Sequence, residues 1–445
     1  MSTVTNNSLV LIKNMTLRHI LFYLYAGLLS LLPGSVFALL EIEITQGIES
    51  ALPIAITQVQ GDTPIDAALL ESVVYSDLYR SGLFSIVDKK KYPQQKVNEE
   101  QIDYEVWRNL GVEALLSMSI NKSDAGQVKI QFELFDLVRK DRALGHVVTV
   151  DQKQLRRAAH KISDVVFEEL TGIKGAFSTR IAYISEIQNR DKKLFELQIA
   201  DADGYGPKTI YSSPKQLMSP AWSPDGRKLA YVSFENDKSE IYIQDISTGQ
   251  RSRLSSQPGI NSSPAWSPDG SYMAMTLSMG GNPDIYIMEL RTRKLTKLTQ
   301  HYGIDTEAAW SPDGRNIVFT SNRSGSPQLY EIPVTGGTPT RLTFEGSYNA
   351  AASVSPMGDT VAMVHGTGNG YQIAIQNLAG NNFRILTEGT LDEAPSFAPN
   401  GSMIIYSTRY RNSAVLSAVS ADGRVKQRLR LEKGKVREPV WSPFR

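Results

Sequence analysis

The chain has 445 residues, enough for two or three domains, and 41% of them are hydrophobic, as in an ordinary globular protein. Its 47 Lys and Arg residues balance 46 Asp and Glu residues, so the net charge of +1 gives no indication of a basic surface for nucleic acid. The absence of cysteine excludes disulfides, thiolate metal ligands and cysteine nucleophiles.

Residues 1–38 have the pattern of a signal peptide. Lys13 and Arg18 precede an apolar run of about 13 residues, which is short for a membrane-spanning helix of roughly 20 residues. A helix-breaking pair and small residues follow, and they fit a cleavage site after Ala38. We therefore expect an exported protein whose translation starts at Met1 or Met15; an uncleaved membrane anchor is the alternative.

Residues 39–172 carry mixed strand and helix patterns and are expected to form a separate α/β domain. Strict alternation in Leu40–Ile44 predicts a strand with one apolar face. Thr63, as a cap, and Pro64, at the first helical position, predict a helix that runs to about Arg80. The other expected elements are strands at 52–56, 112–120, 128–137 and 145–150 and helices at 101–110 and 154–170.

The rest of the chain repeats one motif, Trp-Ser-Pro-Asp-Gly, with looser later copies. Its hydrophobic first position recurs at steps of 44, 44, 44, 43 and 44 residues, at Trp222, Trp266, Trp310, Val354, Phe397 and Trp441. Short β-branched strands follow each copy, and a period in the forties with several strands per unit is typical of a β-propeller blade. We interpret this first position as a packing residue and Ser-Pro-Asp-Gly as a tight turn.

Two incomplete repeats stand at the ends of this region. The strand Ile181–Ser185 has no motif before it, and the last copy, Val440–Pro443, has no strand after it. The two halves complement each other. We therefore expect a six-bladed all-β propeller over residues 177–445, closed by the C-terminal strand.

No set of residues with the spacing of a catalytic or cofactor site is found. The five histidines lack metal-ligand spacing, and no Gly-x-Ser-x-Gly motif occurs. The glycine-rich stretch Gly366–Gly370 fits a hairpin between blade strands better than a phosphate loop. Asp201–Gly204 resembles half of a calcium loop without its remaining carboxylates, so a plain Asp-Gly turn is the favoured interpretation. We expect no catalytic residue, cofactor or metal.

The segments just before each first position are expected to meet around the central channel. They mix acids, amides and hydroxyls with a few apolar groups, namely Met218, Ile304, Tyr348 and Leu391. Polar groups around an apolar centre suit protein recognition, whereas a solvated rim is the alternative.

The leader, the α/β domain and the six blades together resemble the TolB family, the periplasmic propeller component of the Tol–Pal system of Gram-negative bacteria. The most specific matching stretches are Leu217–Gly226, Asp201–Tyr205, Leu391–Gly401 and Trp441–Pro443. The resemblance covers essentially all of residues 39–445 and implies a non-enzymatic adaptor in the periplasm.

The resemblance also implies two partner sites. The propeller mouth would bind the peptidoglycan-associated lipoprotein Pal, a contact that some colicins mimic, through Met218, Ser219, Asn261, Ser263, Thr306, Glu307, Asn349, Asp392 and Glu393. Ile260 stands where relatives have a histidine, which puts that one contact in doubt. The mature N-terminus would bind TolA by strand addition through Leu40, Glu41, Ile42, Glu43, Ile44, Thr45, Gln46 and Gly47.

The expected function is therefore an adaptor that links Pal to TolA and supports outer-membrane integrity and invagination during cell division. Two other classes stay open. One is the propeller of a prolyl-oligopeptidase-like enzyme, which would need a hydrolase domain; the other is a ligand- or glycan-binding propeller, which aromatic rim residues would favour.

Overall fold

The computed structural model describes residues 41–44, 51–93, 102–123, 126–189, 192–380, 382–411, 413–429 and 434–444, and for 41–44 it describes the backbone alone. The predicted signal peptide, residues 1–38, lies outside these residues. Within the described ranges, no helix combines the length and the apolar character needed to cross a membrane.

The N-terminal domain is a mixed sheet covered on one face by two helices. The strand order is β4-β2-β5-β6-β7, and β3 adds to β5. β2 is parallel to β4 and β5, whereas β5, β6 and β7 are antiparallel. The strands are β2 (Leu52–Ile56), β3 (Gln60–Gly61), β4 (Phe84–Ile86), β5 (Ala114–Lys122), β6 (Gln127–Asp136) and β7 (Asp141–Asp151).

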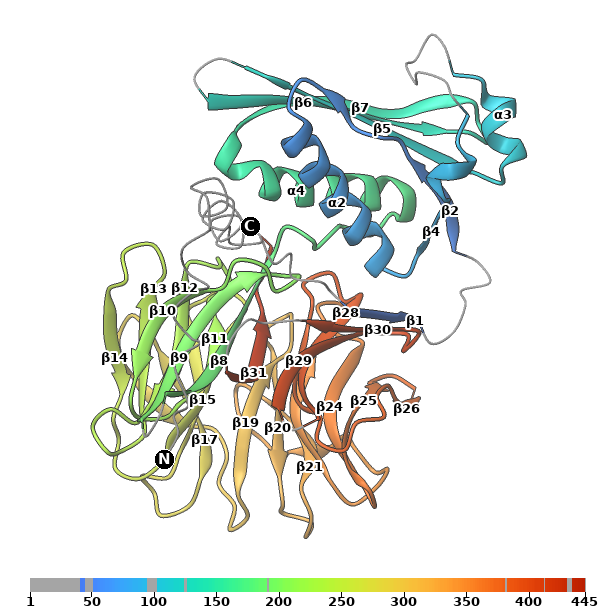
Figure 1. Ribbon diagram of the computed structural model, residues 1–445. Coiled ribbons are helices and arrows are strands. Elements are labelled where there is room, and N and C mark those ends of the chain that lie inside the picture. The colour runs from blue at the N-terminus through green and yellow to red at the C-terminus, as the bar shows by residue number, and fades with distance from the viewer. Residues whose placement is uncertain are drawn as a thin grey trace, which may run out of the picture. The chain divides into compact units, whose positions relative to one another are not determined.

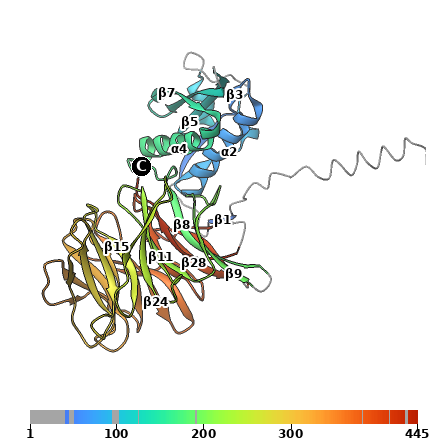
Figure 2. The same cartoon turned by 90° about the vertical axis from the view of Figure 1, so that its left-hand side faces the viewer.

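The helices α2 (Pro64–Arg80) and α4 (Leu155–Thr171) lie side by side on the same face of this sheet (Figures 1 and 2). Their apolar faces and the inward side chains of β2, β5 and β6 form one core that contains Leu70, Ile130 and Ile162. The short helix α3 (Tyr104–Asn109) buries Trp107 in a second cluster with Leu115 and Phe135 on the opposite face.

The predicted helix is confirmed at both ends, with Thr63 at the N-cap and Pro64 to Arg80 in α2, but two local details were not predicted. Thr63 makes no side-chain cap bond, and its buried Oγ1 has no hydrogen-bond partner among the described residues. The first turn of α2 instead uses Pro64, which has no N–H to satisfy. The short strand β4 was missed, because three residues after a helix are too few to show a period.

The remaining chain forms six four-stranded antiparallel sheets, the blades of a propeller. The first blade is β31 (Lys435–Trp441), β8 (Arg180–Asn189), β9 (Lys192–Asp201) and β10 (Lys208–Ser213). The second is β11 (Leu217–Trp222), β12 (Lys228–Ser233), β13 (Glu240–Asp245) and β14 (Arg251–Ser255), and the third is β15 (Asn261–Trp266), β16 (Tyr272–Leu277), β17 (Asp284–Glu289) and β18 (Leu295–Lys297).

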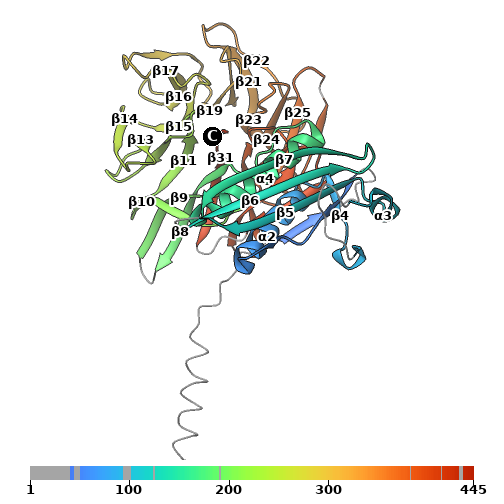
Figure 3. The same ribbon diagram turned by 90° about the horizontal axis from the view of Figure 1, so that it is seen from above.

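The other three blades follow the same order from the innermost strand outward. The fourth is β19 (Asp305–Trp310), β20 (Asn316–Ser321), β21 (Gln328–Pro333) and β22 (Thr340–Arg341). The fifth is β23 (Asn349–Val354), β24 (Thr360–Thr367), β25 (Gly370–Asn377) and β26 (Phe383–Ile385), and the sixth is β27 (Glu393–Phe397), β28 (Met403–Tyr410), β29 (Ser413–Ser420) and β30 (Val425–Leu429). Innermost strands gather around the centre in Figure 3.

The C-terminal strand closes the ring, as predicted. β31 pairs antiparallel with β8, with Val436 opposite Ser185 and Trp441 opposite Ile181. The amide of Ser442 donates to the carbonyl of Arg180 at 2.8 Å.

The repeated motif joins neighbouring blades. The indole Nε1 of Trp266 donates to the carbonyl of Ala221 in the preceding blade at 3.2 Å, and Trp310 repeats this bond with Ala265 at 3.0 Å. Trp222 makes the same bond to Val440, across the closure, at 3.1 Å. At Trp222, Trp266 and Trp310 the first position of the motif is thus both a packing residue and an inter-blade hydrogen-bond donor, whereas Val354 and Phe397 can only pack.

The Ser-Pro-Asp-Gly turns also interlock. The Gly of each turn has positive φ, and a Cβ built on it would meet the proline of the preceding turn, at 3.8 Å for Gly270 and Pro224. Gly226 faces Pro443 in the same way, so the turn contacts also cross the closure. Within a turn, Ser223 Oγ donates to Asp225 Oδ1 at 2.6 Å, and this carboxylate accepts the amide of Arg227 at 3.0 Å.

The segment β1 (Glu41–Ile44) forms a strand, but it belongs to the propeller. It pairs antiparallel with β30 as a fifth strand at the outer edge of the sixth blade, with Glu41 opposite Arg428 and Ile44 opposite Val425. The alternating sequence therefore gives a strand whose four described residues extend another sheet.

The closing indole bond can be tested by Trp222→Phe, which keeps the aromatic packing and removes the donor to Val440. Leaving a carbonyl at the blade interface without its partner should lower the free energy of unfolding by about 1–3 kcal/mol. Urea unfolding followed by fluorescence or circular dichroism measures this difference. Tyr272→Phe, at an exposed tyrosine, is the control; an equal loss in both variants would contradict the role of the indole bond.

Candidate functional site

The candidate site is the end of the channel where the six innermost strands begin, here called the entrance. Equivalent residues of the six blades stand at the same number of residues before the first position of each motif. The entrance consists of the four positions that lie six, five, four and three residues before it. Each has a distinct environment that is shared among the blades.

The first of these positions forms a rim that is apolar in four of the six blades, here called the apolar rim. Its members, six residues before each first position, are Gln216, Ile260, Ile304, Tyr348, Leu391 and Lys435. Ile260, Ile304 and Leu391 are 46%, 47% and 38% exposed, which is unusual for large aliphatic side chains. Tyr348 is partly buried and packs edge-on against Tyr371, with ring centroids 5.0 Å apart.

The next position is buried and anchors the loop that enters each innermost strand. Asn261 accepts from Ser255 Oγ at 2.7 Å and donates to the carbonyl of Gln257 at 2.7 Å. Asn349 donates to the carbonyl of Glu345 at 2.7 Å, and its Oδ1 lies 2.8 Å from Nδ1 of His365.

Two aspartates have the same role in two of the other blades, whereas Leu217 and Val436 occupy this position in the remaining two. Asp305 forms a two-pronged ion pair with Arg323 at 2.9 and 3.0 Å. Asp392 accepts from the hydroxyls of Thr387 and Thr408, and burial raises the pKa of its carboxyl.

Three of the nine residues expected to contact Pal therefore occupy this buried position. Asn261, Asn349 and Asp392 are at most 1% exposed and fully engaged within their own loops. As folded, they present no side-chain surface to a partner, and the geometry gives them the role of holding the entrance loops. The signal was present in the sequence, since an amide or acid recurs five residues before the first position in four repeats.

The following two positions hold the other six residues expected to contact Pal. Met218, Thr306 and Glu393 are at the first of them, and Ser219, Ser263 and Glu307 are at the second. All six are at least partly exposed. The expected site residues thus divide into three that hold the loops and six that are at least partly exposed, of which Met218 also packs against the core between the second and third blades.

The second of these positions has left-handed backbone in every blade. The φ angles are 50° at Ser219, 48° at Ser263, 56° at Glu307, 55° at Ala351, 53° at Ala394 and 52° at Glu438. A left-handed non-glycine residue costs roughly 1–2 kcal/mol. A register shift accompanies each one in its innermost strand, so the chain has a bulge at the same level of every blade.

Two glutamates in this ring bridge to the next blade. Glu307 Oε2 accepts from the amide of Ala351 at 2.9 Å and from Thr320 Oγ1 at 2.8 Å. Glu438 accepts in the same way from the amide of Ser219. The side chains therefore fix the bulged backbone, and sequence analysis missed Glu438 because nothing marked it apart from the other loop residues.

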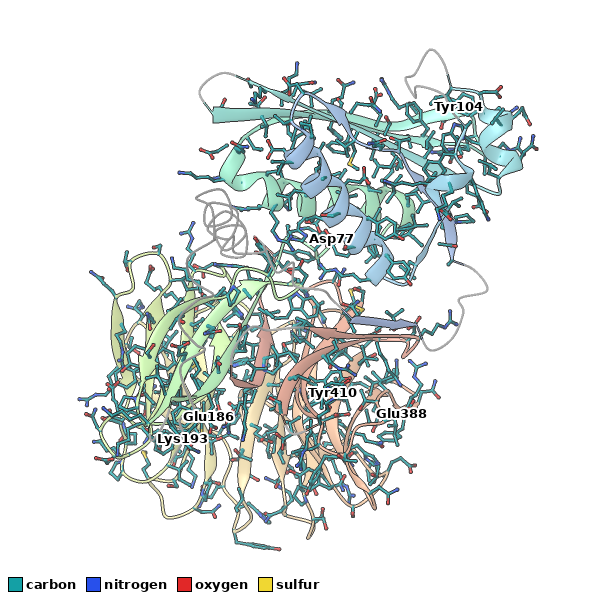
Figure 4. All side chains as sticks on the ribbon, viewed as in Figure 1. Asp77, Tyr104, Glu186, Lys193, Glu388 and Tyr410 are labelled. Carbon is teal, nitrogen blue, oxygen red and sulfur yellow. The ribbon has the colours of Figure 1, made fainter. Side chains whose placement is uncertain are left out.

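The channel is acidic near these bridges. Burial raises the pKa of Glu438, and the carboxylates of Glu393 and Glu307 raise it further. The Ser219 amide and Arg437 oppose this shift without cancelling it. Arg437 is itself ion-paired with Glu186, labelled in Figure 4.

A six-bladed β-propeller with an N-terminal α/β domain and an apolar rim around an acidic channel is the class that this fold and site define. The chain matches the TolB amino-terminal domain family over residues 40–143 and the TolB beta propeller domain family over residues 167–445.

Close relatives cover nearly the whole chain. The Tol-Pal system protein TolB of Thioalkalivibrio sulfidiphilus is 60% identical over 94% of this chain and 97% of its own, and that of Nitrosococcus oceani is 56% identical over 92% and 94%. The crystal structure of TolB from Acinetobacter baumannii superposes with a TM-score of 0.84 at 41% identity, over 91% of this chain and all of that one. The chain belongs to the TolB family, which confirms the resemblance found in the sequence.

The charge of Glu438 is expected to cost stability at neutral pH. Its folded-state pKa lies above the ordinary value of 4.5, so ionisation is harder in the folded protein and stability is lost as the pH rises through the folded pKa. Glu438→Gln keeps an acceptor for the Ser219 amide and stays neutral. We expect it to raise the Tm relative to the native protein at about pH 8, and to change it little near pH 4.

Thermal unfolding by circular dichroism at both pH values measures this effect. Glu169→Gln, on the exposed face of α4, is the matched control. Equal shifts in Tm at the two pH values would show that the charge of Glu438 carries no cost in the channel.

Proposed function

We propose that the protein is a non-catalytic periplasmic adaptor of the Tol–Pal system, which binds Pal at the propeller entrance and TolA through its mature N-terminus. Export by a signal peptide cleaved after Ala38 would place it in the periplasm. Linking the two partners would support outer-membrane integrity and invagination during cell division, and colicins would use the same entrance.

The observation that carries the Pal site is the apolar rim. Exposed Ile260, Ile304 and Leu391 surround a channel lined with polar groups, and a protein partner that buries them would gain roughly 25 cal/mol for each Å² of apolar surface removed from water. The rigid loop anchors keep these side chains in place before binding, which lowers the entropic cost of association.

The six partly exposed residues that follow the buried position complete the proposed surface. Met218, Ser219, Ser263, Thr306, Glu307 and Glu393 offer hydroxyls and carboxylates below the rim. Such a polar floor supplies selectivity, whereas the rim supplies most of the affinity.

The TolA site would be the segment 40–47, of which the structure describes the backbone of 41–44. Its pairing with β30 supports strand addition as its mode of recognition, since the same backbone groups can pair with a strand of another protein. β30 and TolA would then compete for β1. Pal at the entrance would set the balance between β1 docked on β30 and β1 released to TolA.

A glycan-binding propeller stays the second candidate, because two aromatic pairs stand near the entrance. Tyr302 is 85% exposed and stacks on His301 with centroids 4.0 Å apart, and Tyr348 packs on Tyr371. Saturable heats with soluble murein fragments would favour this function.

Titration calorimetry of residues 39–445 against the soluble domain of its own Pal tests the first site. We expect saturable one-to-one binding and at least a tenfold rise in Kd for Ile304→Arg combined with Leu391→Arg. A Thr306→Arg and Glu307→Lys pair is a less clean test, because Glu307 also holds the amide of Ala351.

The control is Met357→Arg, which makes the same chemical change at a 79% exposed residue in a turn at the opposite end of the innermost strands. Unchanged affinity of the rim variant for Pal would show that Pal does not bind at the entrance. Failure of the native protein to bind would remove the Pal function itself.

Deletion of residues 39–47 tests the second site. We expect it to abolish binding to TolA and to leave the affinity for Pal unchanged, because the deleted strand lies at the outer edge of a blade and the rim surrounds the channel. Calorimetry against each partner measures both effects.

Full TolA binding by the deleted protein would contradict this assignment. The proposed balance between docked and free β1 has its own check, since Pal should change the protease protection of residues 39–47. Equal protection with and without Pal would count against the balance.

A further inference from the structure

A partly buried cluster of ionisable groups lies between helix α4 and the first blade. His160 comes from α4, Asp77 and Arg80 from α2, and Asp201 and Asp203 from the end of β9 and the turn that follows it. Figure 4 labels Asp77 on α2. The turn is the Asp-Ala-Asp-Gly stretch that the sequence marked as half of a calcium loop.

His160 is held in one orientation by a carboxylate. The side chain is 2% exposed, and its Nδ1 lies 2.7 Å from Oδ2 of Asp77, which is itself 1% exposed. The other oxygen of Asp77 pairs with Arg80 at 2.9 Å. Because an ionised carboxylate only accepts, Nδ1 carries a proton, and a metal ion that displaces the proton of Nε2 would find the lone pair of that nitrogen. Metal-ligating histidines are oriented by carboxylates in this way.

The free nitrogen of this ring points at two carboxylates. Nε2 of His160 is buried without a hydrogen-bond partner among the described residues. It lies 4.0 Å from Oδ2 of Asp201 and 4.0 Å from Oδ2 of Asp203, and the three atoms all lie within 4.8 Å of one another. Ligands of a tetrahedral Zn²⁺ ion with bonds of about 2.0–2.1 Å stand about 3.3 Å apart, so small side-chain shifts would bring these three together.

Arg156 now balances the charge of the two aspartates. Its guanidinium is ion-paired with Asp203, and its Nε lies 3.4 Å from Oδ2 of Asp201. It also stacks on Tyr205, with Cζ 3.9 Å from the ring centre. A divalent ion bound to both carboxylates would have to displace this guanidinium or share the oxygens with it.

We propose that His160, Asp201 and Asp203 form a divalent-metal site, with Zn²⁺ as the ion best suited to one imidazole and two carboxylates. Asp77 orients the histidine, water completes the coordination, and Arg156 competes with the ion. A bound metal would join α4 to the first blade, so it would tie the N-terminal domain to the propeller.

The test is a zinc titration of metal-stripped protein, residues 39–445, by calorimetry, with the bound metal counted by mass spectrometry. We expect one zinc per chain. His160→Gln and Asp201→Asn should each weaken binding at least tenfold. Asp201 is the more exposed ligand, so its variant keeps the test valid if His160→Gln does not fold.

Arg156→Gln gives a result in the opposite direction. Removing the competing cation should tighten zinc binding, whereas a site elsewhere on the protein would not respond. Arg157→Gln, at its exposed neighbour, is the matched control, and His146→Gln, at an exposed histidine on β7, controls for the loss of a ring.

Two outcomes would overturn the proposal. One is the lack of saturable binding by both the native protein and Arg156→Gln up to about 1 mM zinc, which would leave His160 as a charge partner of the aspartates. The other is zinc binding that is unchanged in both His160→Gln and Asp201→Asn, which would show that the ion binds elsewhere.

Discussion

Closure of the ring by β31 is the interaction on which the rest of the propeller depends. Main-chain pairing with β8 completes the first blade, and the indole bond from Trp222 to Val440 and the contact of Gly226 with Pro443 join the same C-terminal segment to the second blade. The pairing repeats that of the two inner strands in every other blade, and the other two contacts repeat those between neighbouring blades. The C-terminal strand is therefore held like the innermost strand of any other blade.

That regularity builds the entrance. A buried amide or acid holds the loop in four blades, and a left-handed residue bulges the strand two residues later in all six. Glu307 and Glu438 spend their carboxylates on the amides of neighbouring bulges, so the polar floor is part of the framework. The exposed side chains of the rim do not hold the backbone in this way, which leaves Ile260, Ile304 and Leu391 available to a partner.

The sequence predicted the blades well because the repeat is local and strong. A 44-residue period and a turn motif located the innermost strands, and the unmatched halves predicted closure. Periodicity could not separate Asn261, which is buried, from Ser263, which is partly exposed, because a bulge at this level breaks the strand alternation. His160 and Asp203 could not be connected at all, since only the packing of α4 near the first blade brings them together.

The place of β1 has a consequence for the sheet it extends. Several outermost strands end their blades in two or three residues, as β18, β22 and β26 do, and so offer little open edge. β30 has five residues, and the described part of β1 pairs with four of them. If β1 leaves to join a partner, an unpaired edge faces solvent, and such edges attract further strands. The state in which β1 has left β30 is thus also the state in which β30 can most readily pair with a strand of another protein.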